Sequence, residues 1–170
     1  MKVLLKIIII SAVISCITSG SIFVHKKFMI KQKANKQLKL LPNLKLTSLD
    51  SLTINVLDFI EPNKSVIISL FNTDCDHCKQ ELKEIMSIIS NVDINVILIS
   101  SEPIFHVKKY IKENNLQKSS INFAIIDEDK VFETFGAVSF PHILIYNSKG
   151  ELKKKFMGEV KAETILNYIE

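Results

Sequence analysis

Residues 65–90, SVIISLFNTDCDHCKQELKEIMSIIS, decide how the chain folds. The run SVIISLF (65–71) is continuously apolar and rich in β-branched residues, as expected for a strand that is buried on both faces. Over residues 76–90 the apolar side chains recur at helical spacing. Cys75 and Cys78 stand where this strand ends and this helix begins. The pattern predicts an α/β fold with a Cys-x-x-Cys pair at the carboxyl end of a buried strand.

The rest of the folded part alternates between strand-like and helix-like segments. Downstream we expect a strand at 94–101, a helix with Pro103 in its first turn that ends near Asn115, a strand at 121–127, a helix ended by Gly136, a hairpin at 142–158 that turns at NSKG, and a helix at 161–170. Upstream, residues 42–59 mix short alternating runs with turn residues, which is typical of a small hairpin at a sheet edge. Together these segments predict an α/β domain with a mixed sheet.

The N-terminal part of the chain is set apart by its composition. After two early lysines it runs almost uncharged for 18 residues, from Ile7 to Val24. That length is close to the roughly 20 residues that cross a bilayer. We interpret residues 1–24 as a signal or membrane anchor, residues 25–41 as a solvated basic stalk, and residues 42–170 as the folded domain.

Three fates remain open for the apolar segment. It stays in the membrane as an uncleaved helix, it is cut as a secretory signal, or it is cut before Cys16 and lipidated there, because VISC (13–16) resembles a bacterial lipobox. A strict count of the lysines on either side of the span would place the folded domain inside the cell. Because the basic start and the apolar run resemble a secretory signal, we expect instead an extracytoplasmic protein that is attached to the membrane by the uncleaved helix or by a lipid on Cys16.

The charge is unevenly distributed along the chain, whose net charge is +4. Residues 1–50 hold nine Lys and one acid (+8), whereas residues 51–170 hold thirteen Lys and seventeen acids (−4). All 22 basic residues are Lys, which lacks the planar fork suited to bidentate phosphate contacts. A mildly acidic domain with few aromatic residues is a poor candidate for nucleic-acid binding. The basic stalk is better suited to lie near anionic lipid headgroups.

Cys75 and Cys78 have three possible uses: a metal site, a structural disulfide or a redox pair. Zinc needs three or four ligands, but only one further cysteine is present and the other candidate ligands are scattered (His25, His106 and His142). A disulfide across one turn closes too short a loop to stabilise the fold much. We therefore predict no metal and a redox-active pair.

The location of the pair supplies its chemistry. A helix N-terminus stabilises negative charge, which favours the reactive thiolate form of Cys75. We expect Cys75 to be exposed and to attack a disulfide, and the more buried Cys78 to resolve the mixed disulfide. His77 adds positive charge near Cys75 when it is protonated, whereas Asp74 and Asp76 oppose this effect.

Residues 42–170 resemble the thioredoxin-like superfamily, and within it the TlpA/ResA-like extracytoplasmic thiol-disulfide oxidoreductases, with a domain of the AhpC/TSA redoxin type. The resemblance rests on FNTDCDHCKQEL (71–82), on an additional helix–strand stretch at 103–126, and on FGAVSFPHILIYNSKGELKKKFMG (135–158). It implies a thioredoxin-like three-layer α/β/α sandwich with a central mixed sheet and a helix–strand insertion.

The resemblance also implies roles for individual residues. Pro141 matches a cis-proline that faces the Cys-x-x-Cys pair and lets the Phe140 backbone bind a substrate strand. Glu81 matches an acid that handles the proton of Cys78, although a solvated helix residue is an equally good interpretation. The implied partners are protein disulfides and a membrane thiol-electron donor, with no cofactor beyond the Cys75–Cys78 disulfide. We expect a monomer.

Three positions depart from familiar patterns. Ser69 stands where ordinary thioredoxins place a buried Asp, and the chain has no Trp. His142 follows Pro141, where Thr is common, and we expect it to cap the strand rather than to tune Cys75. A histidine in the dipeptide resembles strong oxidants of the superfamily, whereas the TlpA/ResA-like layout implies a reductant. We expect a reductase.

Two other functions stay open. A thiol peroxidase of the peroxiredoxin type shares this fold, but such enzymes resemble one another in a Thr three residues before the reactive Cys, and Thr73 is only two before Cys75. The second is a non-catalytic thioredoxin-like module that binds a partner at the membrane.

Overall fold

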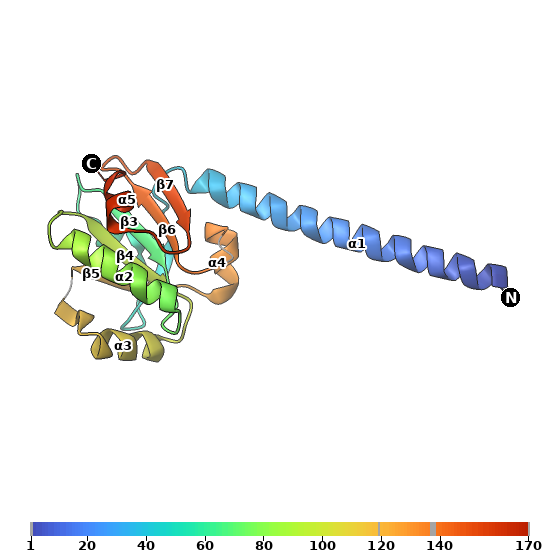
Figure 1. The fold of residues 1–170 in the computed structure, drawn as a ribbon, viewed down its shortest axis with the longest axis horizontal. Helices are drawn as coiled ribbons and strands as arrows, with labels where there is room; N and C mark the ends of the chain where they lie inside the picture. Colours follow the sequence, from blue (N-terminus) through green and yellow to red (C-terminus); the bar gives the residue numbers. More distant parts are fainter. Residues whose placement is uncertain (1, 119, 137–138, 170) are drawn as a thin grey trace.

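The chain is described by a computed structural model over residues 2–118, 120–136 and 139–169 (Figure 1). Predicted segments that include residues 1, 137–138 or 170 are described without those residues. The strands are β1 (Lys45–Ser48), β2 (Thr53–Asn55), β3 (Val66–Leu70), β4 (Asn95–Ser100), β5 (Ile121–Ile125), β6 (His142–Tyr146) and β7 (Leu152–Met157). The helices are α1 (Lys2–Gln37), α2 (Asp76–Ile89), α3 (Ile104–Glu113), α4 (Glu128–Phe135) and α5 (Ala162–Leu166), with short 3-10 turns η1 (Val56–Phe59) and η2 (Leu116–Lys118).

The strands form one mixed sheet in the order β2-β1-β5-β4-β3-β6-β7. The central strands β3, β4 and β5 are parallel, and β6, β7, β1 and β2 are added antiparallel. Every residue of β3 and β4 is buried, as their continuous apolar runs predicted. The hairpin expected within residues 42–59 is confirmed as β1–β2 at one edge of the sheet.

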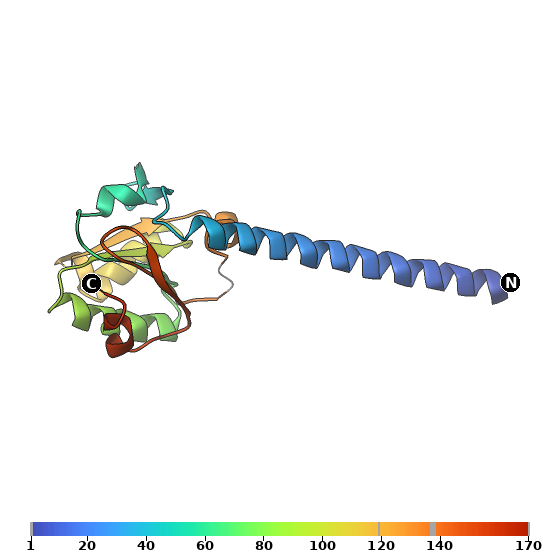
Figure 2. The ribbon, with the colours of Figure 1, turned by 90° about the horizontal axis from the view of Figure 1, so that it is seen from above.

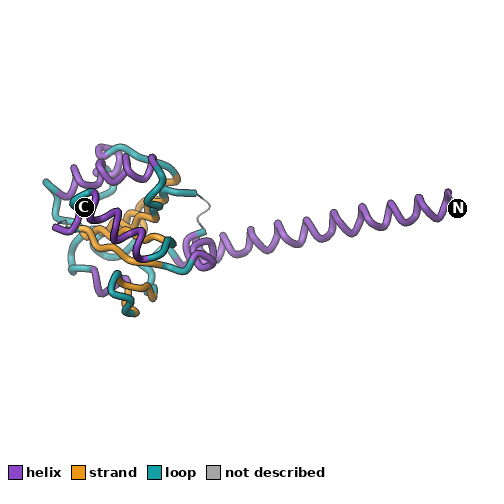
Figure 3. Tube along the Cα trace, turned by 90° about the horizontal axis from the view of Figure 1, so that it is seen from below, coloured by secondary structure: helices purple, strands orange, loops and turns teal. Residues whose placement is uncertain are grey.

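Helices cover both faces of the sheet, which gives the predicted three layers (Figures 2 and 3). One apolar cluster joins the sheet to α2, α3 and α5 and includes Leu82, Val107 and Ile165. The other lies on the opposite face and includes Phe135 of α4 and Leu38, just after α1. The thioredoxin-like α/β fold is thus confirmed, with α3 and β5 as the insertion.

Helix α1 projects far from the domain (Figure 1). Within its described residues, Ile9–Gln37 contains a stretch that is long and apolar enough to cross a membrane, by length and composition. The end of the segment predicted as a solvated stalk behaves differently: Ala34 is fully buried, Leu38 is 1% exposed, and α1 packs against α4. Because these two side chains are four residues apart, they lie on one helical face. The last turns of α1 therefore dock on the domain.

The ends of two helices differ from the predictions. Pro103 caps α3 instead of lying in its first turn. Helix α5 stops at Leu166, earlier than predicted, and Tyr168 packs its ring edge-on against Phe156 of β7, with the centroids 5.8 Å apart. That contact uses the chain end for packing on the sheet rather than for another helical turn. Gly136 ends α4 in the left-handed region (φ 61°), as predicted.

Candidate active site

The chain turns from β3 into α2 through residues 71–75, and Cys75 is the N-cap of α2. The Cys75 sulfur accepts a hydrogen bond from the backbone N–H of Cys78 at 3.2 Å. One of the otherwise unpaired N–H groups of the first helical turn is thus aimed at the sulfur. This arrangement favours negative charge on Cys75. Both cysteines are free thiols in this structure.

The two cysteines lie in different environments. Cys75 is partly exposed, whereas Cys78 is 4% exposed and belongs to the apolar cluster under α2. Burial strongly raises the pKa of the Cys78 thiol, and its hydrogen bond with Cys75 raises it further. The exposed member is therefore placed for attack and the buried member remains a thiol until a base removes its proton.

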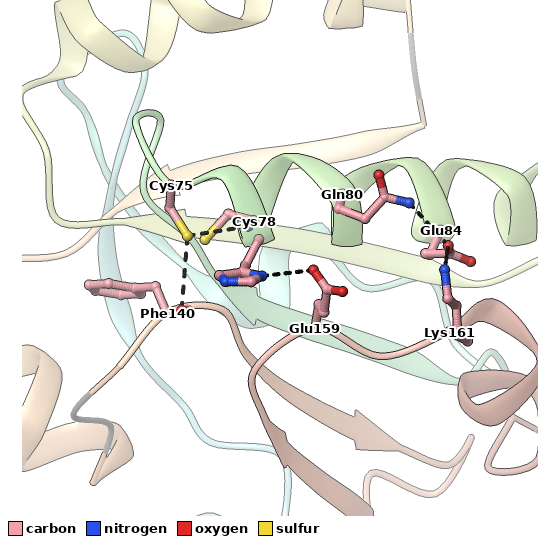
Figure 4. A network of polar contacts seen from close by, with 8 residues as sticks. Cys75, Cys78, Gln80, Glu84, Phe140, Glu159 and Lys161 are labelled. Atoms are coloured by element: carbon pink, nitrogen blue, oxygen red, sulfur yellow. Dashed lines mark hydrogen bonds and ion pairs between the residues drawn. The ribbon is translucent and has the colours of Figure 1, made fainter.

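The Phe140–Pro141 segment faces Cys75 from the other side (Figure 4). The peptide bond between the two residues is cis, as predicted. The Cys75 thiol makes a long hydrogen bond, 3.9 Å, to the Phe140 carbonyl oxygen. The Pro141 carbonyl accepts a hydrogen bond from the N–H of Gly158 at 2.9 Å. The predicted substrate-binding residues thus lie beside the predicted nucleophile, although they are 65 residues apart in the chain.

Glu81 lies inside the domain, one turn after Cys78 on α2. It is only 2% exposed, so the interpretation as a solvated helix residue is wrong. Its Oε1 accepts a hydrogen bond from the Ser69 hydroxyl at 2.6 Å, while Oε2 has no hydrogen-bond partner among the described residues. Burial raises the pKa of Glu81 to about 8, the Ser69 hydrogen bond opposes this rise, and the charge of Glu159 adds to it. Glu81 and Cys78 line the same small interior pocket.

The same contact explains the departure at position 69. The buried acid of this site comes from α2, and β3 contributes the hydroxyl that holds it. Serine on the strand and glutamate on the helix together place a carboxyl group next to the buried cysteine.

His77 points away from the interior and pairs with Glu159. Its Nδ1 lies 2.9 Å from Glu159 Oε2, and the two side chains are 75% and 44% exposed. Asp76, the other residue between the cysteines, pairs instead with Lys79 at 2.9 Å, and this pairing lowers the pKa of Asp76. Each of the two residues between the cysteines thus has a partner of opposite charge type, Lys79 for Asp76 and Glu159 for His77.

His142 does not cap its strand, contrary to the prediction. It is fully buried at the start of β6, and neither ring nitrogen has a hydrogen-bond partner among the described residues. It is paired with Leu70, on the sheet face opposite to Cys78. The pKa of His142 is lowered to about 4, mainly by burial and in part by the charges of Lys155 and Lys31. A neutral imidazole on that face adds no positive charge to the Cys-x-x-Cys pair at neutral pH.

Glu102 is a site residue that the sequence reasoning missed. Its carboxylate accepts hydrogen bonds from the N–H and the hydroxyl of Thr73, both at 2.7 Å, and from the Ser100 hydroxyl at 3.0 Å. These bonds fix the loop two residues before Cys75. The signal was available: Glu102 follows β4, the parallel neighbour of β3, so the carboxyl ends of both strands meet at one edge.

Among the residues that the structure describes, no group of three or more His, Cys, Asp or Glu side chains is arranged to hold a metal ion. The arrangement around Cys75 supports thiol chemistry instead. It combines a nucleophile at a helix N-cap, a buried second thiol, and a buried acid whose raised pKa suits proton transfer near neutral pH.

The domain is similar to several solved structures. StoA from Bacillus subtilis is 16% identical, with a TM-score of 0.58 over 76% of this chain and 98% of that chain. The pneumococcal exposed lipoprotein thioredoxin of Streptococcus pneumoniae is 20% identical, with a TM-score of 0.56 over 74% and 96%. A peroxiredoxin-like protein from Aquifex aeolicus is 15% identical, with a TM-score of 0.62 over 76% and 82%. At these identities the likeness concerns the fold.

None of the curated proteins compared with the chain matches it. The model of the AhpC/TSA family matches residues 38–155, which include both cysteines, Glu81 and the cis-proline. That range begins at Leu38, the residue at which the chain enters the core. The chain belongs to the AhpC/TSA family.

Proposed function

We propose that this protein is a membrane-attached, extracytoplasmic thiol-disulfide oxidoreductase that reduces disulfides of partner proteins through Cys75 and Cys78. One observation carries the proposal: the Cys75 sulfur sits at the N-cap of α2, accepts the Cys78 N–H and faces the Phe140 carbonyl. A nucleophilic sulfur and an open backbone acceptor thus lie side by side, as a polypeptide disulfide would require.

The first step is attack by the Cys75 thiolate on one sulfur of the substrate disulfide. The substrate S–S bond breaks, a bond forms between Cys75 and the attacked sulfur, and the other substrate sulfur leaves as a thiolate. The N–H of Cys78 stabilises the attacking anion, and the partial exposure of Cys75 gives a protein substrate access to it.

The second step uses the buried pair. Cys78 transfers its proton to the free Oε2 of Glu81 and attacks the Cys75 sulfur, which releases the second substrate sulfur as a thiolate. The substrate has then gained two electrons as a dithiolate and becomes a dithiol by taking up one proton released by Glu81 and one from water, while Cys75 and Cys78 have become a disulfide. A membrane thiol-electron donor returns two electrons to that disulfide and restores the starting state.

Helix α1 supports the proposed location. Its apolar part, Ser11 to Val24 where described, is exposed in the isolated chain, as a lipid-facing helix is. The proposal keeps both modes of attachment, the uncleaved helix and a lipid on Cys16. One of the similar solved structures is of an exposed lipoprotein thioredoxin. The protein works as a monomer beside the membrane, with protein disulfides as substrates.

Trapping of the mixed disulfide tests the proposal. The variant Cys78→Ser should accumulate a covalent Cys75–substrate adduct with an insulin-type disulfide substrate or with partner proteins, because the second step is blocked. Cys75→Ser should form no adduct and show no disulfide reduction while its thermal unfolding stays close to that of the wild type. A wild-type protein that exchanges no disulfide with any dithiol would leave the non-catalytic binding module as the better explanation.

A thiol peroxidase is the second candidate, because the AhpC/TSA family match and a peroxiredoxin-like neighbour both accommodate it. The local geometry disfavours it: the Thr73 hydroxyl, the nearest threonine before Cys75, donates to Glu102. We expect peroxide consumption supported by a dithiol to be much slower than disulfide reduction. The reverse ratio of rates would reassign the protein to the peroxidases.

A further inference from the structure

The segment between β7 and α5 is fixed at both ends against the candidate active site. At one end, the Gly158 N–H donates to the carbonyl of Pro141, with Gly158 at φ 92°, a conformation that favours glycine. At the other end, the Ala162 N–H and the Lys161 ammonium donate to the Glu84 carboxylate of α2, at 3.0 and 3.1 Å. The segment thus runs from the cis-proline to Glu84 and lies alongside the first turns of α2 (Figure 4).

Glu159 lies between these two anchors and is held against the Cys-x-x-Cys dipeptide. Its carboxylate contacts His77 at 2.9 Å, and its charge reaches Glu81 inside the domain. Because the segment is bonded at both ends, the backbone at position 159 is held beside the dipeptide.

Two of the other charged side chains near the dipeptide have partners of their own. Asp76 binds Lys79, and Lys161 binds Glu84 although it also lies within the field of Glu159. Asp74, before Cys75, is exposed. A histidine in this dipeptide would by itself stabilise a thiolate on Cys75 when protonated. Glu159 is the carboxylate that is placed against that histidine.

We propose that Glu159 biases the redox equilibrium of the site: its negative charge, held 2.9 Å from the His77 ring, disfavours the Cys75 thiolate and so makes the Cys75–Cys78 couple a stronger reductant. The inference rests on the proposed function, because it concerns the redox couple of the same site. Glu159 touches neither sulfur, so it acts as a positioning and tuning residue.

The relevant equilibrium is reduction of the disulfide form by a dithiol. The Cys75–Cys78 disulfide and dithiothreitol give the Cys75 thiolate, the Cys78 thiol, oxidised dithiothreitol and one released proton. Two electrons pass from the reagent to the protein, and the new negative charge appears on Cys75. A negative charge at position 159 opposes this reaction, and its removal favours the reduced protein.

A charge series at position 159 tests the inference, measured as the fraction of reduced protein in buffers of reduced and oxidised dithiothreitol. Glu159→Gln should raise the equilibrium constant for reduction about two- to five-fold, a range set by the exposure of the pair. Glu159→Lys should raise it more, and Glu159→Asp should remain closer to the wild type. The shift should shrink in high salt, because exposed charges are screened.

Glu128→Gln supplies the matched control: it removes one negative charge from an exposed position in the first turn of α4. This variant should leave the equilibrium unchanged. The thiolate absorbance at neutral pH should increase in Glu159→Gln and not in the control, a change that a purely structural role of Glu159 would not produce.

The two proposals fail in different ways. A wild-type protein that never interconverts between disulfide and dithiol forms would overturn the proposed function itself. A wild type that equilibrates normally, but with an unchanged constant across the series or with the same shift in Glu128→Gln, would overturn only the role of Glu159. A shift of equal size at low and high salt would also contradict it.

Discussion

Two carboxylates of the site lie on opposite sides of the Cys-x-x-Cys turn, and they differ in almost every respect except their chemistry. Glu81 lies under α2 beside the buried Cys78 and is 2% exposed. Glu159 lies over the surface side, next to His77, with a side chain that is 44% exposed. The same functional group therefore meets a medium of low polarizability on one side and water on the other.

The difference between the two sides decides what each carboxylate can do. A charge in the interior interacts strongly and is costly to form, so burial shifts the pKa of Glu81 and makes it a proton carrier. A charge at the surface is screened, so Glu159 can bias an equilibrium but cannot control a proton. Glu81 on the buried side should therefore determine the rate at which Cys78 resolves the mixed disulfide, and Glu159 on the exposed side should adjust the redox equilibrium.

The largest expected effect is on folding stability, through Glu81. Its pKa is raised from 4.5 to about 8 in the folded state, so its contribution to stability is fully present below about 4.5 and is lost as the pH rises through about 8. Glu81→Gln cannot ionise and avoids this loss. Relative to the wild type, the variant should gain stability by roughly 1.4 kcal/mol per pH unit across that window, up to about 5 kcal/mol.

Denaturant unfolding of the reduced proteins at a series of pH values measures this gain. Glu128→Gln, which changes an exposed carboxylate, should follow the wild-type curve. The stability difference between Glu81→Gln and the wild type could instead stay constant from acid to alkaline pH. That result would show that the pKa of Glu81 is not raised, and the contrast between buried Glu81 and exposed Glu159 would disappear.

The next effect is on the rate at which Cys78 resolves the mixed disulfide. Glu81→Gln should slow this step about 100-fold, the lower end of what a positioned base contributes. In the wild type, the rate of resolution should rise with pH through about 8, as Glu81 ionises. This rising limb of the pH–rate profile should be missing from the variant. Rapid-mixing measurements with a fluorescent peptide disulfide separate the two steps. A variant that slows the first attack by Cys75 instead would place Glu81 in a different role.

The contrast between the two sides also marks what the sequence could predict. The strand–CxxC–helix unit, the mixed sheet and the cis peptide before Pro141 followed from local patterns and from the family resemblance. The interior position of Glu81 left two interpretations open, because a helix that packs on a sheet has both a buried and a solvated face. Only the packing of α2 on β3 decides which face holds that residue.

Contacts between segments distant in sequence could not be predicted from the sequence, for a physical reason. Glu159 is 82 residues from His77, and nothing local to either residue indicates the pairing. The docking of Ala34 and Leu38 was hidden because two apolar side chains in and just after a lysine-rich helix carry little weight against its composition. His142 was expected to bond a strand end, but the register of β6 turns it into the apolar face.

A smaller effect is expected from Ser69, whose substitution tests how the pKa of Glu81 is set on the buried side. Its hydroxyl donates to Glu81 Oε1 and lowers the pKa of that carboxyl against the effect of burial. Ser69→Ala removes this hydrogen bond, so the pKa of Glu81 should rise further and the alkaline limb of the resolution rate should move up by about one pH unit. Ser87→Ala, at an exposed position of α2, is the control and should leave the limb in place. A limb that moves to lower pH would contradict the assignment.

The smallest effect concerns the anchoring of the exposed side. Glu102 accepts two hydrogen bonds from Thr73 and one from Ser100, so one carboxylate holds the loop that carries Cys75. Glu102→Gln keeps the shape but lacks the charge, and should cost about 1 kcal/mol of stability and slow the attack by Cys75 a few-fold. Thr73→Val removes only the hydroxyl, so its cost should be smaller than that of Glu102→Gln.

In both variants the rise of the resolution rate near pH 8 should stay at the same pH, because Glu81 is held by β3 and α2 and not by this loop. If loosening the loop moved that limb, the two sides of the site would be coupled through the backbone, and a surface substitution could then tune the buried proton transfer.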